Sequence, residues 1–282
     1  MSLSNLIKNW SSFRARRPYE DQYKDKDYKW AMVIDLDVCI GCNACTTACY
    51  AENNLPVVGK QRFAKGHAMH WIRIERYWGE GEAMEGTFPE RGAEFLPMLC
   101  QQCEAAPCEP VCPVGATHHT PDGLNSQVYN RCIGSRYCSA NCPYKVRYFN
   151  FWQYPETAWP NPLEEQLNPD VTVRSKGVME KCTFCVQRLT DAKNRARTEN
   201  RRVADGEVMT ACQQACPTSA IAFGNLADKK SQVAQIWDRQ KVDLAKDKQD
   251  KGEEGLRGYR IFEDMRTYPS IVYMERVRNF EV

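Results

Sequence analysis

The chain has 282 residues, of which 43% are hydrophobic and 26% are charged. Its 38 basic and 36 acidic residues leave a formal charge of +2, which gives no reason to expect a nucleic-acid-binding protein. The 15 cysteines are the outlying feature, and an odd number argues against a complete disulfide framework.

Residues 1–30 are predicted to form an N-terminal arm. Arg16 and Arg17 are followed by Pro-Tyr-Glu-Asp and not by an apolar segment, so the arm lacks the features of a secretory or twin-arginine signal. No stretch of the chain reaches the roughly 18 consecutive apolar residues that a membrane-spanning helix needs. From the sequence itself we expect no signal peptide and no transmembrane helix.

All the cysteines fall into four runs. Run one holds Cys39, Cys42, Cys45 and Cys49; run two holds Cys100, Cys103, Cys108 and Cys112, followed by Pro113; run three holds Cys132, Cys138 and Cys142, followed by Pro143; and run four, split by a long insert, holds Cys182, Cys185, Cys212 and Cys216, followed by Pro217. Ser135 stands where another cysteine would complete run three.

The spacing within the runs is that of bacterial ferredoxins. Two-residue spacers place three thiolates on one tight loop, and the cysteine after a three-residue spacer reaches a neighbouring cluster. Pro113, Pro143 and Pro217 fix the backbone as the chain leaves a site, and Gly41 and Gly134 let the backbone approach inorganic sulfide. A zinc ribbon uses two pairs of cysteines for one ion, a pattern that run one does not follow. Iron–sulfur clusters are therefore favoured over zinc and disulfides.

An internal repeat indicates the fold. The segment from Cys112 to Thr117 resembles that from Cys216 to Ile221, and each leaves a cysteine run for a short strand. After the first, residues 117–129 are typical of a hairpin with an Asp-Gly turn. We predict an α+β fold of two ferredoxin-like βαββαβ units with insertions and a C-terminal extension.

The segments between the runs complete the predicted organisation. Residues 31–94 form unit A, completed by run four in 175–225; residues 95–150 form unit B with runs two and three; residues 151–174 form an aromatic and Pro-rich loop; and residues 226–282 form a C-terminal helix and tail for partner contact. The aromatic residues of 144–159 either dock a partner or pack over the last cluster. The insert 186–211 is predicted to be a basic surface helix and loop, and residues 270–277 a strand. His67, His70, His118 and His119 are expected to be structural.

The runs closely resemble the four-cluster iron–sulfur subunits of the molybdopterin oxidoreductase superfamily, over roughly residues 30–225. This resemblance implies a crossed arrangement of ligands. It assigns Cys39, Cys42, Cys45 and Cys216 to one [4Fe-4S] cluster, Cys49, Cys182, Cys185 and Cys212 to a second, Cys100, Cys103, Cys108 and Cys142 to a third, and Cys112, Cys132 and Cys138 to a fourth with Ser135 at its open corner.

Ser135 sets the fourth cluster apart. A serine hydroxyl is a poor iron ligand beside soft thiolates, so we expect a [3Fe-4S] cluster here and three [4Fe-4S] clusters elsewhere. The alternative is a serine alkoxide that holds a fourth iron. The resemblance places this cluster at the quinone end. Basic residues near the runs either offset the clusters' negative charge or are ordinary solvated charges: Arg131, Arg136, Lys145, Arg147, Lys181 and Arg188.

Residues 161–185 narrow the resemblance to the iron–sulfur components of alternative complex III and of the menaquinone reductase (Qrc) complex of sulfate reducers. This likeness implies a polytopic quinone-binding membrane subunit, a molybdopterin-family-like subunit and a multihaem cytochrome c as partners, on the periplasmic face of the membrane, with export alongside a partner. The expected function is single-electron transfer between a periplasmic cytochrome and menaquinone, without catalysis by this chain alone. The alternatives are the electron-transfer subunit of a molybdenum reductase or formate dehydrogenase, and a free polyferredoxin.

Overall fold

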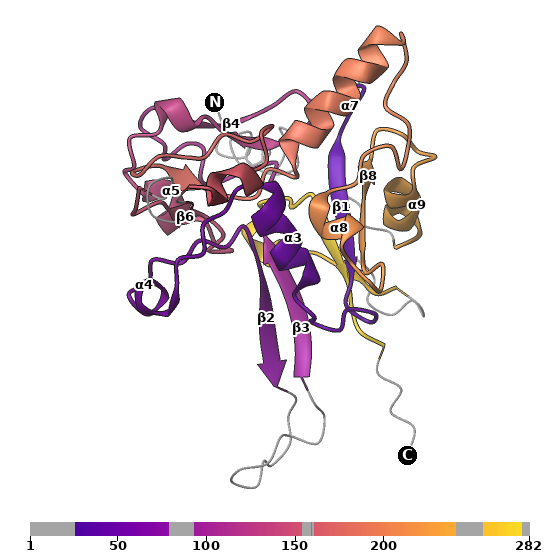
Figure 1. Ribbon diagram of the computed structural model, residues 1–282. Helices are drawn as coiled ribbons and strands as arrows, with labels where there is room; N and C mark the ends of the chain where they lie inside the picture. Colours follow the sequence, from indigo (N-terminus) through magenta and orange to yellow (C-terminus); the bar gives the residue numbers. More distant parts are fainter. Residues whose placement is uncertain (1–25, 79–92, 154–158, 160, 241–255, 278–282) are drawn as a thin grey trace, which may run out of the picture.

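The computed structural model describes residues 26–78, 93–153, 159, 161–240 and 256–277 (Figure 1). Most of the predicted N-terminal arm lies outside the described residues, and the first strand already begins at Trp30. Within the described residues, no helix is both long and apolar enough to cross a membrane.

A four-stranded sheet lies next to cysteine runs one and four. Its strands are β1 (Trp30–Asp35), β8 (Ile221–Asn225), β9 (Gly258–Tyr259) and β10 (Ile271–Met274), in the order β8-β1-β10-β9. β1 pairs antiparallel with β8 and parallel with β10. It is buried on both faces, as its apolar sequence requires. Run one therefore leaves this sheet at the end of β1, and run four returns to it at the start of β8.

Two helices connect the sheet to the cysteine runs. α3 (Ala44–Glu52) follows β1 and α8 (Ala211–Gln214) precedes β8, and the two pack against each other (Figure 1). The order β1-α3 and α8-β8 thus brings the first and last cysteine runs together. The whole βαββαβ order of each unit stays a prediction.

Three strand pairs frame runs two and three. β2 (Ile72–Trp78) pairs with β3 (Ala93–Leu99), which leads into run two. β4 (Thr117–His119) and β5 (Asn125–Gln127) form the hairpin predicted around Asp122 and Gly123, where Gly123 has a φ of 81°. β6 (Tyr148–Phe149) pairs with β7 (Met179–Glu180) and so joins the end of run three to the start of run four.

The remaining helices match the sequence prediction in part. The insert begins with α7 (Val186–Thr198), the predicted basic surface helix, which buries Leu189, Ala192 and Ala196. α9 (Gln232–Arg239) is capped at its N-terminus by Ser231, whose hydroxyl accepts from the Ala234 N–H at 3.2 Å, and it packs Val233 and Trp237 on β1 and β10. Shorter elements are α4 (Lys60–Ala64), α5 (Tyr137–Asn141), and the 3-10 turns η1 (Tyr129–Arg131), η2 (Leu163–Gln166) and η3 (Glu263–Met265).

The C-terminal tail belongs to the core. The predicted strand is present as β10, but it lies between β1 and β9 with Ile271, Val272 and Tyr273 fully buried. The Tyr273 hydroxyl donates to the Pro97 carbonyl at 2.9 Å and so also fixes β3. This strand therefore serves the fold of the chain itself, and partner contact by the rest of 226–282 stays a prediction.

Candidate metal centres

The first thiol group gathers around the start of α3. Cys39, Cys42, Cys45 and Cys216 line one cavity, although Cys216 comes from the far end of the chain. These are the thiols that the resemblance assigns to one cluster. Burial raises the pKa of Cys45 to about 11, and the neighbouring thiols of Cys39 and Cys216 raise it as well.

The second group lies about one turn further along α3, at Cys49. Cys49 is buried, and its pKa is raised well above the ordinary value by burial and then by the thiols of Cys182, Cys185 and Cys212. Ala211 donates its N–H to the Cys185 sulfur at 3.4 Å, which ties α8 to this group. Run four therefore supplies three thiols next to the lone fourth thiol of run one.

The third group also shares a cavity. Cys100, Cys103, Cys108 and Cys142 line it, together with the side chains of Asn125 and Arg147. Burial raises the pKa of Cys103, and the thiols of Cys100, Cys108 and Cys142 raise it further.

The fourth group contains three thiols, those of Cys112, Cys132 and Cys138. Burial raises the pKa of Cys138; Arg147 opposes this effect, and the nearby thiols of Cys132 and Cys112 add to it. Burial also acts to raise the pKa of Cys112, but N–H groups of the following turn outweigh it, so that this pKa is lowered. Ser135 is exposed on the loop between Cys132 and Cys138.

The loops of runs one and three have the same backbone geometry. Gly41 and Gly134 have φ values of 67° and 72°, and the residues that cap the following helices, Asn43 and Arg136, have φ values of 63° and 62°. Aligned in this way, Ser135 occupies the position of Cys42, which is likewise exposed. The serine is therefore a substitution within a duplicated loop and not a change of loop structure.

The two Cys-Pro turns repeat each other as well. The Ala116 N–H donates to the Cys112 sulfur at 3.2 Å, and the Ala220 N–H donates to the Cys216 sulfur at 3.3 Å. Such N–H···S bonds stabilise a thiolate and are one means by which a protein sets the potential of a cluster. The repeat read from the sequence is thus also a repeat of ligand environment.

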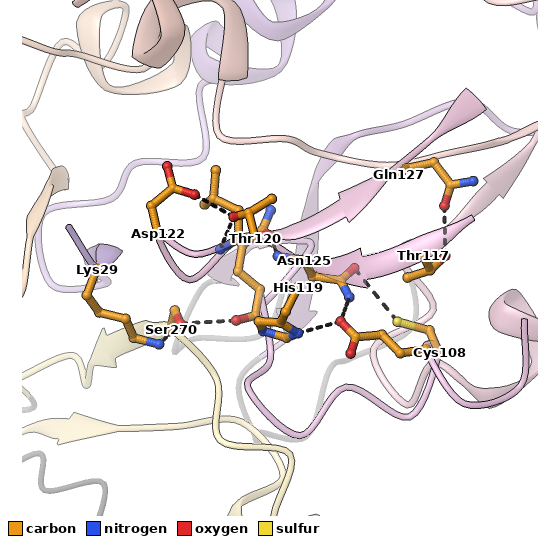
Figure 2. Close-up of polar contacts among 12 residues, drawn as sticks. Lys29, Cys108, Thr117, His119, Thr120, Asp122, Asn125, Gln127 and Ser270 are labelled. Atoms are coloured by element: carbon orange, nitrogen blue, oxygen red, sulfur yellow. Dashed lines mark hydrogen bonds and ion pairs between the residues drawn. The ribbon is translucent and has the colours of Figure 1, made fainter. Parts of the chain in front are cut away.

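Side chains that the sequence analysis missed support the sulfurs. Asn53 donates from Nδ2 to the Cys49 sulfur at 3.5 Å, and the Thr210 hydroxyl lies 3.2 Å from the Cys212 sulfur. Asn53 lies four residues after Cys49, a spacing that places it on the same helix face and is visible in the sequence. Asn125, 3.8 Å from the Cys108 sulfur, comes from the β4–β5 hairpin, and only the folded chain shows it there (Figure 2).

The six basic residues near the runs lie in different surroundings. Arg131, Arg136 and Lys145 are exposed, and Arg188 forms an ion pair with Glu52 at 2.6 Å. Arg147 and Lys181 are buried, and Lys181 donates from Nζ to the Cys182 carbonyl at 3.0 Å. The interpretation as ordinary solvated charges therefore fits the three exposed residues. It fails for Arg147 and Lys181, which are buried.

Three of the four histidines make contacts of a structural kind, and His118 is exposed. The His67 ring stacks on Phe151 with 4.0 Å between ring centroids, and the Tyr50 hydroxyl lies 2.6 Å from His70 Nδ1. His119 pairs with Glu109 beside the β4–β5 hairpin (Figure 2).

The described residues of the aromatic loop pack against other parts of this chain. Phe149 lies under the Arg136 guanidinium, with 5.1 Å to the ring centroid, and so covers the loop of run three. Arg62 lies 4.3 Å over the Trp152 ring, which remains 37% exposed. Packing over the fourth thiol group accounts for Phe149, while docking of a partner stays a prediction for the exposed rings.

The donor set fits iron–sulfur clusters. In the described residues, no three His, Cys, Asp or Glu side chains are close enough to hold a single metal ion. Two groups of four thiols each line a cavity, and soft thiolates are the ligands that these clusters take.

Gly134→Ala is expected to damage the run three loop. A Cβ at this position would lie 2.3 Å from the Gly177 carbonyl oxygen, in addition to the cost of about 1–2 kcal/mol for alanine in the left-handed region. We expect a lower melting temperature and a lower iron content. Gly66→Ala is the matched control, since Gly66 has a φ of 77° and nothing within 4 Å of its Cβ. Equal effects of the two substitutions would contradict this explanation.

Comparison with known proteins gives consistent matches. Residues 38–116 and 92–155 each match a family model described as a 4Fe-4S dicluster domain. The iron–sulfur cluster-binding subunit of menaquinone reductase from Nitratidesulfovibrio vulgaris is 40% identical over 90% of this chain and 91% of its own length. The iron–sulfur subunit of arsenate respiratory reductase from a Shewanella species is 34% identical over 82% of this chain and 94% of its own length. The B subunit of polysulfide reductase from Wolinella succinogenes is 30% identical over 74% of this chain and 82% of its own length.

Proposed function

The chain belongs to the iron–sulfur subunits of the molybdopterin oxidoreductase family, and on that premise we propose that it exchanges single electrons between a partner subunit or periplasmic cytochrome c and the menaquinone pool. The observation that carries this proposal is the similarity to the menaquinone reductase subunit, which extends over 90% of the chain. The relatives are electron-transfer subunits of larger reductases, and the 4Fe-4S dicluster domains agree with that role.

The cofactors we propose are three [4Fe-4S] clusters and one [3Fe-4S] cluster. When bound, such clusters accept and release single electrons at potentials that their ligands and hydrogen bonds set. The chain would hold them through the crossed thiol groups, in which the last cysteine of one run joins three thiols of another. This crossing is supported by Cys216, which lines the same cavity as three thiols of run one.

Substitutions in crossed pairs test the ligand groups. Cys42→Ala and Cys216→Ala are expected to remove or alter the same EPR signal, because both thiols line one cavity. Cys49→Ala and Cys212→Ala are expected to affect a different signal together, since the Cys212 thiol raises the pKa of Cys49. If Cys216→Ala instead resembled Cys212→Ala, its neighbour in run four, the crossed assignment would be wrong.

The open corner at Ser135 predicts an iron count. We expect about 15 iron atoms per chain, from three four-iron clusters and one three-iron cluster, and a three-iron EPR signal in the oxidised protein. Ser135→Cys is expected to convert this signal into that of a four-iron cluster of lower potential, because the serine occupies the position of Cys42 in the repeated loop. An EPR-silent oxidised protein with about 16 irons would instead favour a serine-bound fourth iron.

The partners we propose are a polytopic quinone-binding membrane subunit, a molybdopterin-family-like subunit and a multihaem cytochrome c, with this chain on the periplasmic face of the membrane. Export together with a partner would bring the chain to that face. The proposed contact regions are the exposed Trp152 and the part of residues 226–282 outside β10.

The second candidate is the electron-transfer subunit of a molybdenum reductase. The likeness to the subunits of arsenate and polysulfide reductases favours it, at 34% and 30% identity. A free polyferredoxin is the third candidate, and purification of the fully active chain as a monomer without detergent would support it.

Isolation of the native complex through a tag on this chain separates these functions. For the menaquinone function we expect covalently bound haem, no molybdenum, and electron exchange between the cytochrome and a water-soluble menaquinone analogue. The exchange should be lost in Cys42→Ala while the complex stays assembled. Molybdenum in stoichiometric amount, with reduction of an oxyanion or polysulfide, would overturn the first proposal in favour of the second.

A further inference from the structure

Arg147 is a buried cation held by neutral groups. It exposes 4% of its surface and lies five residues after Cys142. Its two terminal nitrogens donate to the Thr117 hydroxyl at 3.1 and 3.2 Å, to Gln127 Oε1 at 3.2 and 3.3 Å, and to Asn125 Oδ1 at 3.4 Å. These partners all belong to the β4–β5 hairpin, whose Thr117, Asn125 and Gln127 appear together in Figure 2.

The charge of Arg147 is not compensated by a carboxylate. Among the described residues, no Asp or Glu oxygen lies within ion-pair distance of its guanidinium, and its buried Nε has no hydrogen-bond partner. Removing an unpaired charge from water costs several kcal/mol, so a buried arginine needs an anion nearby. Neutral oxygens provide hydrogen bonds but no opposite charge.

Arg174 is a second buried arginine, and it differs from Arg147 in having a carboxylate partner. It exposes 5% of its surface, and its Nε donates to Glu180 Oε2 at 2.9 Å. The two arginines have nearly equal burial, yet only Arg174 has a carboxylate partner.

The anions nearest to Arg147 are the thiol groups. Its side chain lines the cavity of Cys100, Cys103, Cys108 and Cys142. Burial acts to lower the pKa of Arg147, but the thiols of Cys108, Cys138, Cys100 and Cys142 outweigh it and raise this pKa. Cys138 belongs to the fourth group and the other three to the third, so Arg147 lies close to both.

A backbone contact fixes this position. The Ser139 hydroxyl, on α5 directly after Cys138, donates to the Arg147 carbonyl at 3.0 Å. The segment that carries Arg147 is thus bound to the helix of run three at one side, while its side chain is bound to the hairpin at the other. The guanidinium is held in place before any electron arrives.

We propose that Arg147 is a positioning residue for electron transfer, whose fixed charge raises the reduction potentials of both the third and the fourth centre. Reduction by one electron adds one negative charge to a centre, and a nearby cation in a low-dielectric interior stabilises that charge. This inference rests on the proposed ligand groups. It predicts that the removal or the neutralisation of this one charge shifts two centres together.

Two substitutions in the native complex test the proposal by EPR-monitored redox titration. Arg147→Gln removes the charge, and Gln127→Glu keeps the arginine but places a carboxylate against it, with almost no change in shape. For each variant we expect the equilibrium constant for one-electron reduction of both centres to fall at least about tenfold, equivalent to about 59 mV. Arg147→Lys, which keeps the charge, is expected to retain most of the potential.

Arg131→Gln is the matched control. Arg131 precedes Cys132 directly in the sequence but is exposed, so water and salt screen its charge, and we expect less than about a threefold change. Iron and sulfide content and the wild-type EPR signals are measured on the same samples. Missing clusters in the wild type would refute the proposed function itself. Intact clusters with unchanged potentials in Gln127→Glu would refute only the role of Arg147, even if Arg147→Gln fails to assemble.

Discussion

The structure depends on thiols that are buried in groups. Each burial disfavours the thiolate, and each neighbouring thiol disfavours it further, so that the pKa of Cys108 and of Cys212 is raised to about 12. Thiolates this close together require a positively charged core of metal to be stable. Because ligands must lose their protons to bind metal, cluster binding and folding are coupled in such a protein. The helices and strands around the thiols serve mainly to hold these otherwise repelling groups in place.

The fold achieves this with short local loops and a few long-range pairings. Left-handed residues such as Gly41 and Asn43 turn the backbone around each group of thiols, and N–H groups like that of Ala220 donate to the sulfurs. The pairing of β1 with β8 then brings the ends of runs one and four together. In the first group, local geometry thus supplies three thiols, and the sheet supplies the remaining one, Cys216.

This division explains what could be predicted from the sequence. The cysteine spacing, the Asp-Gly hairpin and the helix that includes Trp237 depend on neighbouring residues, and all of these are visible in the chain. The central place of β10 depends on pairing with β1, which lies more than two hundred residues earlier, and no periodicity reports it. Arg147 likewise looked no different from Arg131 in the sequence. Its burial arises from the β4–β5 hairpin, which contributes the side chains that hold it.

The loops of runs one and three share a backbone geometry, but the residues that follow these two runs differ in charge. Five residues beyond the last cysteine of run one stands Asn54, whose amide donates to the carbonyls of Asn168 and Val171 at 2.9 and 2.6 Å. The same distance beyond the last cysteine of run three stands Arg147. The run that has Ser135 at the position of Cys42 is therefore also the one that is followed by a buried cation. A three-iron cluster usually has a higher potential than a four-iron cluster, and a nearby cation stabilises an added electron, so the two changes act in the same direction. On the proposed ligand groups, the centres of runs two and three form the more oxidising end of the chain.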